Sequence, residues 1–410
     1  MTNFLAKTTA GALIAALALT PLTAFATPQT LPAEASASQV VPAAFRGQLV
    51  SAVKLERLSA AAVDKTAKAM GFVNPPQARN GVTAYRVVYR TITPEGRPTT
   101  ASGLVVLPNG RRGSLSVAEY LHGTNGTKNQ VASMTAGPDR TIALMLAGSG
   151  LVAVAPDYLG LGVGPGRHPY IDTRSETTAS TDLLLAAKIF SRRYGVQLKR
   201  DVLVTGFSQG GRATLSVGRA LQNKEVPGFR LGALEAVAGP YDLEKTELPA
   251  VFDGRVNPQV AVLYLGYFIT AWNRTVGLYD DPREAFTVDG VEELFDGYHQ
   301  VEEIAMALPS ALDQLLTPAF KAKLLNPSGA YLRALREADS ICRDWTPRVP
   351  VNLHTGTADT DVVPANATKC ATTLTHRGAR VTIHPIPHAD HNTTALTAYP
   401  QITRTFTPNP

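Results

Sequence analysis

Residues 201–211 read Asp-Val-Leu-Val-Thr-Gly-Phe-Ser-Gln-Gly-Gly, and this stretch decides the fold. Its first half is a short apolar run, which is typical of a buried strand. Residues 206–210 then fit the G-x-S-x-G pattern, in which a serine occupies a sharp turn between a strand and a helix. The alternative is a glycine-rich turn with a solvated serine. The strand before the turn and the amphipathic helix expected up to about Leu221 favour a reactive Ser208.

Similar units of strand, loop and helix surround this stretch. A hairpin is expected first, from two alternating runs at 83–89 and 100–107. Short apolar runs then alternate with helical segments, which predicts an α/β fold with a mostly parallel sheet covered by helices on both faces. The expected strands are 116–121, 151–155, 201–205, 231–237, 349–354 and 379–386, and the expected helices are 49–70, 139–147, 177–194, 365–373 and a last one from about 392.

The alternation stops between residues 243 and 345, where helical stretches occur without a convincing strand. This pattern predicts a helical insertion between two late strands of one sheet. The expected organisation is a signal peptide at 1–26, a leader and helix at 27–75, a first core part at 76–242, a helical cap at 243–345 and a second core part at 346–410.

The first 26 residues are typical of a secretory signal peptide. Lys7 precedes the apolar run 12–19, Pro21 interrupts it, and residues 24–26 (Ala-Phe-Ala) form a small-x-small cleavage site. A buried N-terminal helix is the alternative. No cysteine follows the cleavage site, and no later stretch is long and apolar enough for a membrane helix. We therefore expect an exported protein, periplasmic or extracellular, without an integral membrane segment.

Composition excludes several classes of protein. The chain has 410 residues, of which 44% are hydrophobic and 18% charged, as in ordinary globular proteins. Its net charge of +6 is spread thinly, without the clustered basic residues of a nucleic-acid site. We expect no nucleic-acid partner. The two cysteines, Cys342 and Cys370, predict one disulfide in an oxidising compartment, with two free thiols as the alternative.

A reactive serine needs a base, and the base needs an acid that orients it. Residues 356–364 (Gly-Thr-Ala-Asp-Thr-Asp-Val-Val-Pro) follow an expected strand, so they lie at the carboxyl edge of the sheet. Asp359 is the favoured acid and Asp361 its competitor. Both could instead cap the next helix.

Three histidines lie in or after the last expected strand. His391 precedes the last helix, the position expected of the base, and His388 is its main competitor. His384 falls inside the strand and is expected to be a packing residue. His388 and His391 also form an H-x-x-H pair, but it falls in a loop and lacks the wider pattern of a zinc site, so we expect no metal.

The loop after strand 116–121 (His-Gly-Thr-Asn-Gly) occupies the place of an oxyanion-binding loop. Gly123 or Thr124 would supply one backbone N–H, and Gln209, after the serine, would supply the other. An ordinary glycine turn is the alternative. Tyr158 and Phe207 are candidates for substrate contact, and core packing is an equally good interpretation of both.

Taken together, these segments resemble the α/β-hydrolase fold and, more narrowly, the secretory lipase family and its bacterial relatives. The segments that carry the resemblance are 122–124, 156–162 with 168–170, 206–211, 345–347, 356–364 and 389–391. The resemblance implies a serine esterase or lipase that needs no cofactor and has a helical cap over its site. By position, Ser208, Asp359 and His391 match the family's nucleophile, acid and base. Pro364 lies one position farther from Asp359 than in the family pattern, which keeps Asp361 open.

A carboxylic ester, at a lipid interface or in solution, is the expected substrate. A prolyl-type peptidase and a non-catalytic binding protein of the same fold are the alternatives. The apolar stretches 260–272 and 304–315 fit a lipid-facing lid or core helices of the cap, and the second interpretation is favoured.

Overall fold

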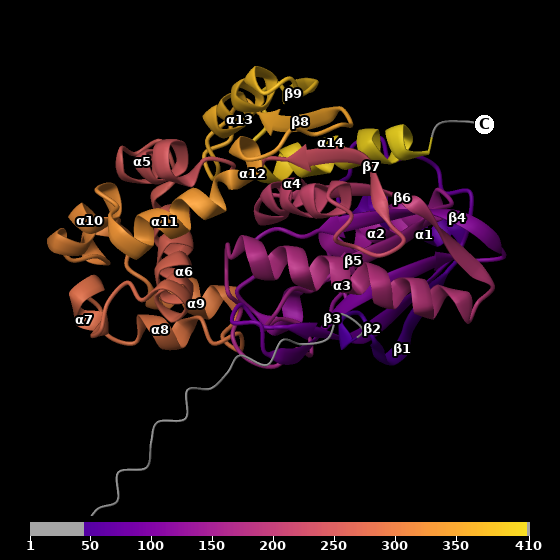
Figure 1. The fold of residues 1–410 in the computed structure, drawn as a ribbon, viewed down its shortest axis with the longest axis horizontal. Helices are drawn as coiled ribbons and strands as arrows, with labels where there is room; N and C mark the ends of the chain where they lie inside the picture. Colours follow the sequence, from indigo (N-terminus) through magenta and orange to yellow (C-terminus); the bar gives the residue numbers. More distant parts are fainter. Residues whose placement is uncertain (1–44, 408–410) are drawn as a thin grey trace, which may run out of the picture. The chain divides into compact units, whose positions relative to one another are not determined.

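The computed structural model describes residues 45–407, so the expected signal peptide and most of the leader lie outside the described residues. One nine-stranded sheet crosses the molecule in the order β1-β2-β3-β5-β4-β6-β7-β8-β9 (Figure 1). Its strands are β1 (Leu49–Leu58), β2 (Val82–Ile92), β3 (Pro98–Pro108), β4 (Gly113–Leu121), β5 (Val152–Pro156), β6 (Val196–Phe207), β7 (Arg230–Val237), β8 (Val351–Gly356) and β9 (Val381–Ile386).

The strands from β5 to β9 along the sheet pair in parallel, whereas β1, β2 and β3 pair antiparallel. The expected hairpin is β2 with β3, in register from Val82 opposite Pro108 to Ile92 opposite Pro98. The prediction of a mostly parallel α/β sheet is therefore confirmed.

Helices cover both faces of the sheet. One face packs against α1 (Ala60–Ala69), α2 (Pro138–Gly148) and α14 (His391–Phe406). The other packs against α3 (Thr173–Arg192), α4 (Gln209–Gln222) and α13 (Ala365–His376). Each interface is a continuous cluster of buried apolar side chains. Because both faces are covered, the central strands contain short apolar runs, which is why they stand out in the sequence.

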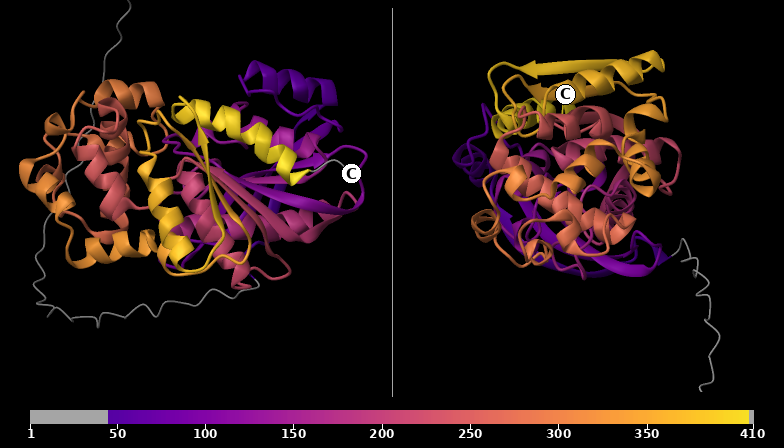
Figure 2. Two further views of the ribbon diagram at one scale, coloured as in Figure 1. Left: turned by 90° about the horizontal axis from the view of Figure 1, so that it is seen from above. Right: turned by 90° about the vertical axis from the view of Figure 1, so that its left-hand side faces the viewer.

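The residues between β7 and β8 form a group of helices, here called the cap, at one end of the sheet (Figure 2). The cap has an apolar core of its own. It consists of a π-helix (Leu243–Glu247), α5 (Leu248–Phe252), α6 (Pro258–Val276), α7 (Pro282–Ala285), α8 (Val291–Leu294), α9 (Val301–Ala307), a 3-10 helix (Leu312–Gln314), α10 (Pro318–Leu325), α11 (Gly329–Ala338) and α12 (Ser340–Arg343).

The expectation of a helix over residues 49–70 is wrong in its first half. Residues Leu49–Leu58 form β1, and the helix α1 begins only at Ala60. The run Lys-Leu-Glu-Arg at 54–57 favours a helix locally, but antiparallel pairing with β2 at the sheet edge overrides that preference. One face of β1 is open to solvent, so its side chains do not show the apolar run of a buried strand.

Cys342 and Cys370 form a disulfide that joins α12 to α13, with Cα atoms 5.3 Å apart. It links the end of the cap to the second part of the core. Closing a loop of 28 residues contributes about 3–4 kcal/mol in the chain-entropy model. Among residues 45–407, no helix is both long and apolar enough to span a membrane.

Candidate active site

Ser208 occupies the turn between β6 and α4 with a backbone φ of +56°. A positive φ is rare for a residue with a side chain, and such strain persists only where the surroundings enforce it. Two glycines make the turn possible. A Cβ at Gly206 would lie 2.2 Å from the carbonyl oxygen of Gly210, and a Cβ at Gly210 would lie 1.9 Å from that of Leu121. The Ser208 N–H donates to the Val237 carbonyl, which anchors the turn to β7.

His391 begins α14, and its Nδ1 lies 2.7 Å from Oδ2 of Asp359. Both side chains are buried. The other carboxylate oxygen of Asp359 accepts the backbone N–H groups of Asp361 and Val362, at 2.9 and 3.0 Å. The structure thus pairs His391 with Asp359, while the Asp361 side chain makes no bond to that ring. Burial raises the pKa of Asp361.

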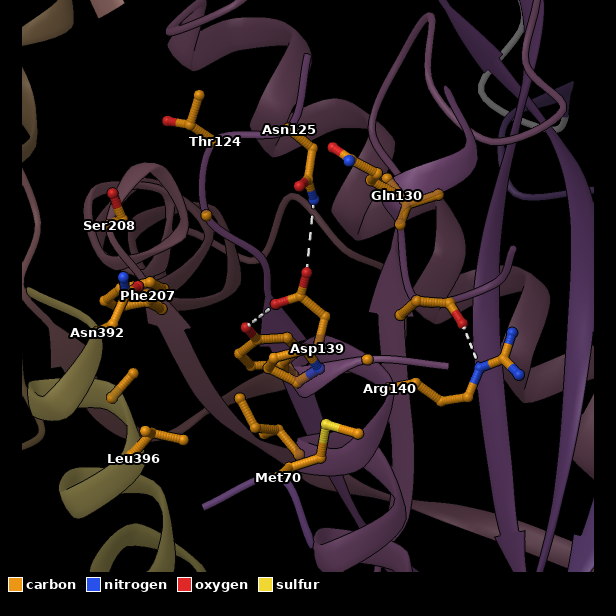
Figure 3. Close-up of a pocket in the computed structure, with 18 of the residues that line it drawn as sticks. Met70, Thr124, Asn125, Gln130, Asp139, Arg140, Phe207, Ser208, Asn392 and Leu396 are labelled. Atoms are coloured by element: carbon orange, nitrogen blue, oxygen red, sulfur yellow. Dashed lines mark hydrogen bonds between the residues drawn. The ribbon is translucent and has the colours of Figure 1, made fainter. Parts of the chain in front are cut away.

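Nε2 of His391, the far nitrogen of the ring, is buried and has no hydrogen-bond partner among the described residues. The ring packs at 4.6 Å from the ring of Phe207, the residue before the serine. His391, Phe207 and Ser208 line the same open cleft of about 510 Å³ (Figure 3). This cleft brings the candidate nucleophile and the candidate base to one surface.

The competing histidines lie elsewhere. His388 is exposed, and its backbone N–H donates to the Thr357 hydroxyl. His384 stacks on the ring of His354 and lies 3.0 Å from the amide oxygen of Asn352. Within residues 45–407, no group of three or more His, Cys, Asp and Glu side chains could hold a metal ion.

The loop after β4 lies against the serine. A Cβ at Gly123 would lie 3.3 Å from the Cβ of Ser208, so this loop backbone approaches the nucleophile closely. Gly123 and Thr124 line the cleft, and the Thr124 hydroxyl is 2.7 Å from the hydroxyl of Tyr170. Gln209 is the first residue of α4, where backbone N–H groups have no acceptor within the helix. These backbone groups could bind an anion beside Ser208.

No family model and no curated protein sequence matches this chain. Solved structures do. A Legionella pneumophila protein matches with a TM-score of 0.78 and 26% identity over 88% of this chain and 99% of its own. The rice cell wall degrading esterase LipA from Xanthomonas oryzae, in a ligand-bound form, matches with a TM-score of 0.78 and 26% identity over 88% and 98%.

A third solved structure is less similar to this chain. Candida antarctica lipase A in its closed state has a TM-score of 0.59 at 15% identity, over 87% of this chain and 81% of its own, and that likeness concerns the fold alone. The chain is a member of the α/β-hydrolase superfamily. The likeness to the LipA esterase at 26% identity supports a hydrolase that acts on esters.

In this α/β-hydrolase the side chain of Gln209 is held by two buried groups that the sequence did not reveal. Its Nε2 lies 2.8 Å from Oε1 of Glu176 and 2.9 Å from Nε2 of His168. Nδ1 of His168 lies 2.9 Å from the Leu159 carbonyl and donates to it, which leaves Nε2 as the acceptor for Gln209. Burial lowers the pKa of His168 to about 3 and raises the pKa of Glu176 to about 7.

Tyr158 does not line either of the cavities that Ser208 borders. It is fully buried with a φ of +65°, and its hydroxyl donates to the His122 carbonyl at 3.3 Å. Its ring packs 4.3 Å from the ring of His122. Tyr158 therefore supports the loop that carries Gly123, and the packing interpretation fits it. Phe207, by contrast, lines the cleft.

Further residues border the serine without a local signature in the sequence. Tyr264 of α6 lines the cleft, and Glu247 of the cap lines a smaller cavity on the other side of Ser208. Asn125 and Tyr120 both donate to the carboxylate of Asp139 on the opposite wall, at 3.4 and 2.5 Å (Figure 3). The apolar side chains of α6 and Ile304 of α9 are buried in the cap core, which agrees with core helices.

Proposed function

We propose that this protein is a serine carboxylic-ester hydrolase with Ser208 as nucleophile, His391 as base and Asp359 as the acid that orients the base. One observation carries the proposal: a serine on a strained turn between strand and helix shares a cleft with a buried histidine, and that histidine is hydrogen-bonded to a buried carboxylate. The superfamily relation to an esterase and a lipase supports the same chemistry.

In the first half of the reaction, Oγ of Ser208 bonds to the ester carbonyl carbon while its proton passes to Nε2 of His391. The carbonyl oxygen becomes an anion, which the backbone N–H groups of Gln209 and of Gly123 or Thr124 stabilise. The bond from carbon to the alcohol oxygen then breaks, and His391 gives its proton to that oxygen. Asp359 holds the Nδ1–H tautomer and stabilises the charged ring.

In the second half, His391 takes a proton from water as the water oxygen bonds to the acyl carbon. The bond between that carbon and Oγ of Ser208 breaks, His391 returns the proton to Oγ, and the acid leaves. These steps need no cofactor. The unpartnered Nε2 of the buried His391 supports its role, because that nitrogen has no competing donor among the described residues.

The proposed enzyme is exported through residues 1–26. The disulfide between Cys342 and Cys370 supports an oxidising compartment. N-terminal sequencing of protein recovered outside the cytoplasm should begin at residue 27. A start at Met1 would contradict the export proposal.

Turnover of p-nitrophenyl butyrate by Ser208→Ala tests the mechanism. We expect kcat/KM to fall by at least about a thousandfold with the fold intact, because the nucleophile is lost. Ser310→Ala is the matched control, since Ser310 is an exposed serine of the cap whose hydroxyl donates to Gln314. Ser310→Ala should keep wild-type turnover. Equal activity of Ser208→Ala and wild type would refute the mechanism.

A further inference from the structure

Two cavities meet at Ser208. The first is the cleft of about 510 Å³, which is lined in part by residues of α2 and α14 and by Met70 and Phe72 just after α1. The second has only about 60 Å³ and lies beneath α5 and α6 of the cap. Ser208 and Tyr264 are the residues that line both cavities. An ester bound at Ser208 has two arms, the acyl group and the alcohol group. Each arm must occupy one of these two cavities.

The position of His391 indicates which of the two cavities holds the alcohol group of the ester and which holds the acyl group. Its ring lines the cleft and is not part of the lining of the small cavity. In the proposed reaction His391 gives its proton to the alcohol oxygen, so the alcohol must leave on the side of the serine that His391 occupies. The alcohol arm therefore lies in the cleft. The small cavity remains for the acyl arm.

Bulky apolar side chains form much of the wall of the small cavity. They come from the cap and from the loop before α3, namely Ile171, Leu243, Leu248, Val251, Leu265 and Phe268. Sites for complete small molecules usually measure about 300–1,000 Å³, a range that includes the cleft but not this cavity. At about 60 Å³ the small cavity is far smaller than the cleft of about 510 Å³, so it accepts a smaller group than the cleft does.

Among the described residues that line the small cavity there is no lysine, arginine or histidine to pair with an anion. Its one carboxyl belongs to Glu247, whose Oε2 accepts from Asn366 Nδ2 at 2.5 Å and from the Val363 N–H at 3.3 Å. Burial raises the pKa of Glu247 to about 8. A charged acyl group would lose its hydration there without gaining a partner of opposite charge.

We propose that the enzyme is selective for esters that join an uncharged acyl group shorter than octanoyl to a bulky, largely apolar alcohol. The inference rests on the proposed function and adds the acyl side of its substrate. The apolar floor of the cleft, formed by side chains such as Met70, Phe72, Ile142 and Leu396, is large enough for the alcohol.

The test compares p-nitrophenyl esters, which share p-nitrophenol as the alcohol and differ in the acyl group: acetate, butyrate, octanoate or succinate. We expect kcat/KM to fall at least about tenfold from butyrate to octanoate. We expect a similar fall from butyrate to the succinate half-ester, which has the same number of carbons but ends in a negatively charged carboxylate. A second series of acetate esters, all of primary alcohols with similar leaving-group pKa, should show kcat/KM rising from ethyl to 2-naphthylethyl alcohols.

Two Leu→Ala variants distinguish the cavity proposed for the acyl group from the cleft proposed for the alcohol. Leu265→Ala enlarges the small cavity alone, so the octanoate-to-butyrate ratio should rise at least about fivefold. Leu396→Ala changes the cleft alone, so it should leave that ratio unchanged. Val251→Ala, a smaller truncation in the same wall, replaces Leu265→Ala if that variant does not fold.

The outcomes are distinct. Octanoate turned over as well as butyrate, or an acyl ratio that moves in Leu396→Ala and not in the cap variant, would overturn the acyl assignment while the ester hydrolase proposal stands. No turnover of any ester by folded wild-type protein would refute the proposed function and the acyl assignment with it.

Discussion

Nδ1 of His391 lies 2.7 Å from Oδ2 of Asp359, although a second aspartate, Asp361, stands only two residues farther along the same loop. The backbone of this loop determines which of the two aspartates pairs with His391. After Asp359 the chain turns so that the N–H groups of Asp361 and Val362 both point at Oδ1 of Asp359. That arrangement fixes the carboxylate and leaves Oδ2 for the histidine.

Asp359→Asn should therefore lower kcat about ten-thousandfold with little change in the fold. The amide keeps the shape of the carboxylate, but it stabilises the wrong histidine tautomer and cannot balance the charged ring. Asp361→Asn is the matched control and should retain kcat within about threefold, because its carboxylate does not touch His391. Kinetics with a p-nitrophenyl ester measure both. A large loss in Asp361→Asn and a small one in Asp359→Asn would contradict the assignment.

The strained turn at Ser208 gives a second prediction, on stability. Gly210→Ala places a Cβ 1.9 Å from the Leu121 carbonyl oxygen, and backbone cannot move aside cheaply at the end of a central strand. We expect the free energy of unfolding to fall by more than about 3 kcal/mol, at the severe end of single substitutions. Urea unfolding measures the change.

Gly137→Ala controls for the glycine-to-alanine change itself. Its φ of −172° suits any residue, and within residues 45–407 no atom beyond the neighbouring backbone lies within 4 Å of the added Cβ. The midpoint of urea unfolding should move little. If Gly210→Ala were as stable as Gly137→Ala, that result would contradict the close packing of the Ser208 turn against β4.

The sequence was most informative where local chemistry decides the structure. The buried parallel strands appear as short apolar runs because both of their faces are covered, and Ser208 is marked by glycines that its turn requires. The prediction of a helix was wrong at Leu49–Leu58, because pairing with β2 at the sheet edge determines the conformation there.

The rest of the candidate site depends on tertiary contacts. Which aspartate meets His391 follows from the direction of two backbone N–H groups, and neither residue identity nor spacing encodes that direction. Glu176 and Glu247 are single acidic residues in helices, where most such residues are solvated. Only the packing of α3 and of the cap against the sheet brings them beside Ser208 and Gln209.

The bond from Gln209 to Glu176 predicts a positioning role for this buried glutamate. Glu176→Leu removes the acceptor 2.8 Å from Gln209 Nε2, so the residue whose backbone N–H would bind the oxyanion loses an anchor. We expect kcat to fall about ten- to a hundredfold with KM nearly unchanged, because the oxyanion develops only in the transition state.

Glu176→Gln should restore most of kcat, since its side-chain oxygen can still accept from Gln209. Circular dichroism and the melting temperature show whether each variant is folded. If Glu176→Leu were folded and raised KM while leaving kcat unchanged, Glu176 would act on substrate binding and the positioning role would be refuted.

Glu119 gives a last prediction, on the pH dependence of stability. It lies in β4 between Val154 of β5 and Val204 of β6, fully buried, and neither carboxyl oxygen has a hydrogen-bond partner among the described residues. Burial raises the pKa of Glu119 well above its ordinary value of 4.5. The folded protein therefore keeps a proton that the unfolded chain releases, and the free energy of unfolding falls as pH rises from about 4.5 towards the raised pKa.

Glu119→Leu removes both this titration and the unpaired polar group. The variant should be more stable than wild type at pH 7, and its advantage should shrink as the pH falls to 4.5, where the wild-type glutamate is half protonated even when unfolded. Urea unfolding of both proteins at several pH values, with the disulfide kept oxidised, measures the difference. Other buried carboxyls act on both proteins alike, so the difference isolates Glu119. An advantage that stays constant between pH 4.5 and 7 would mean that Glu119 does not titrate differently in the folded state.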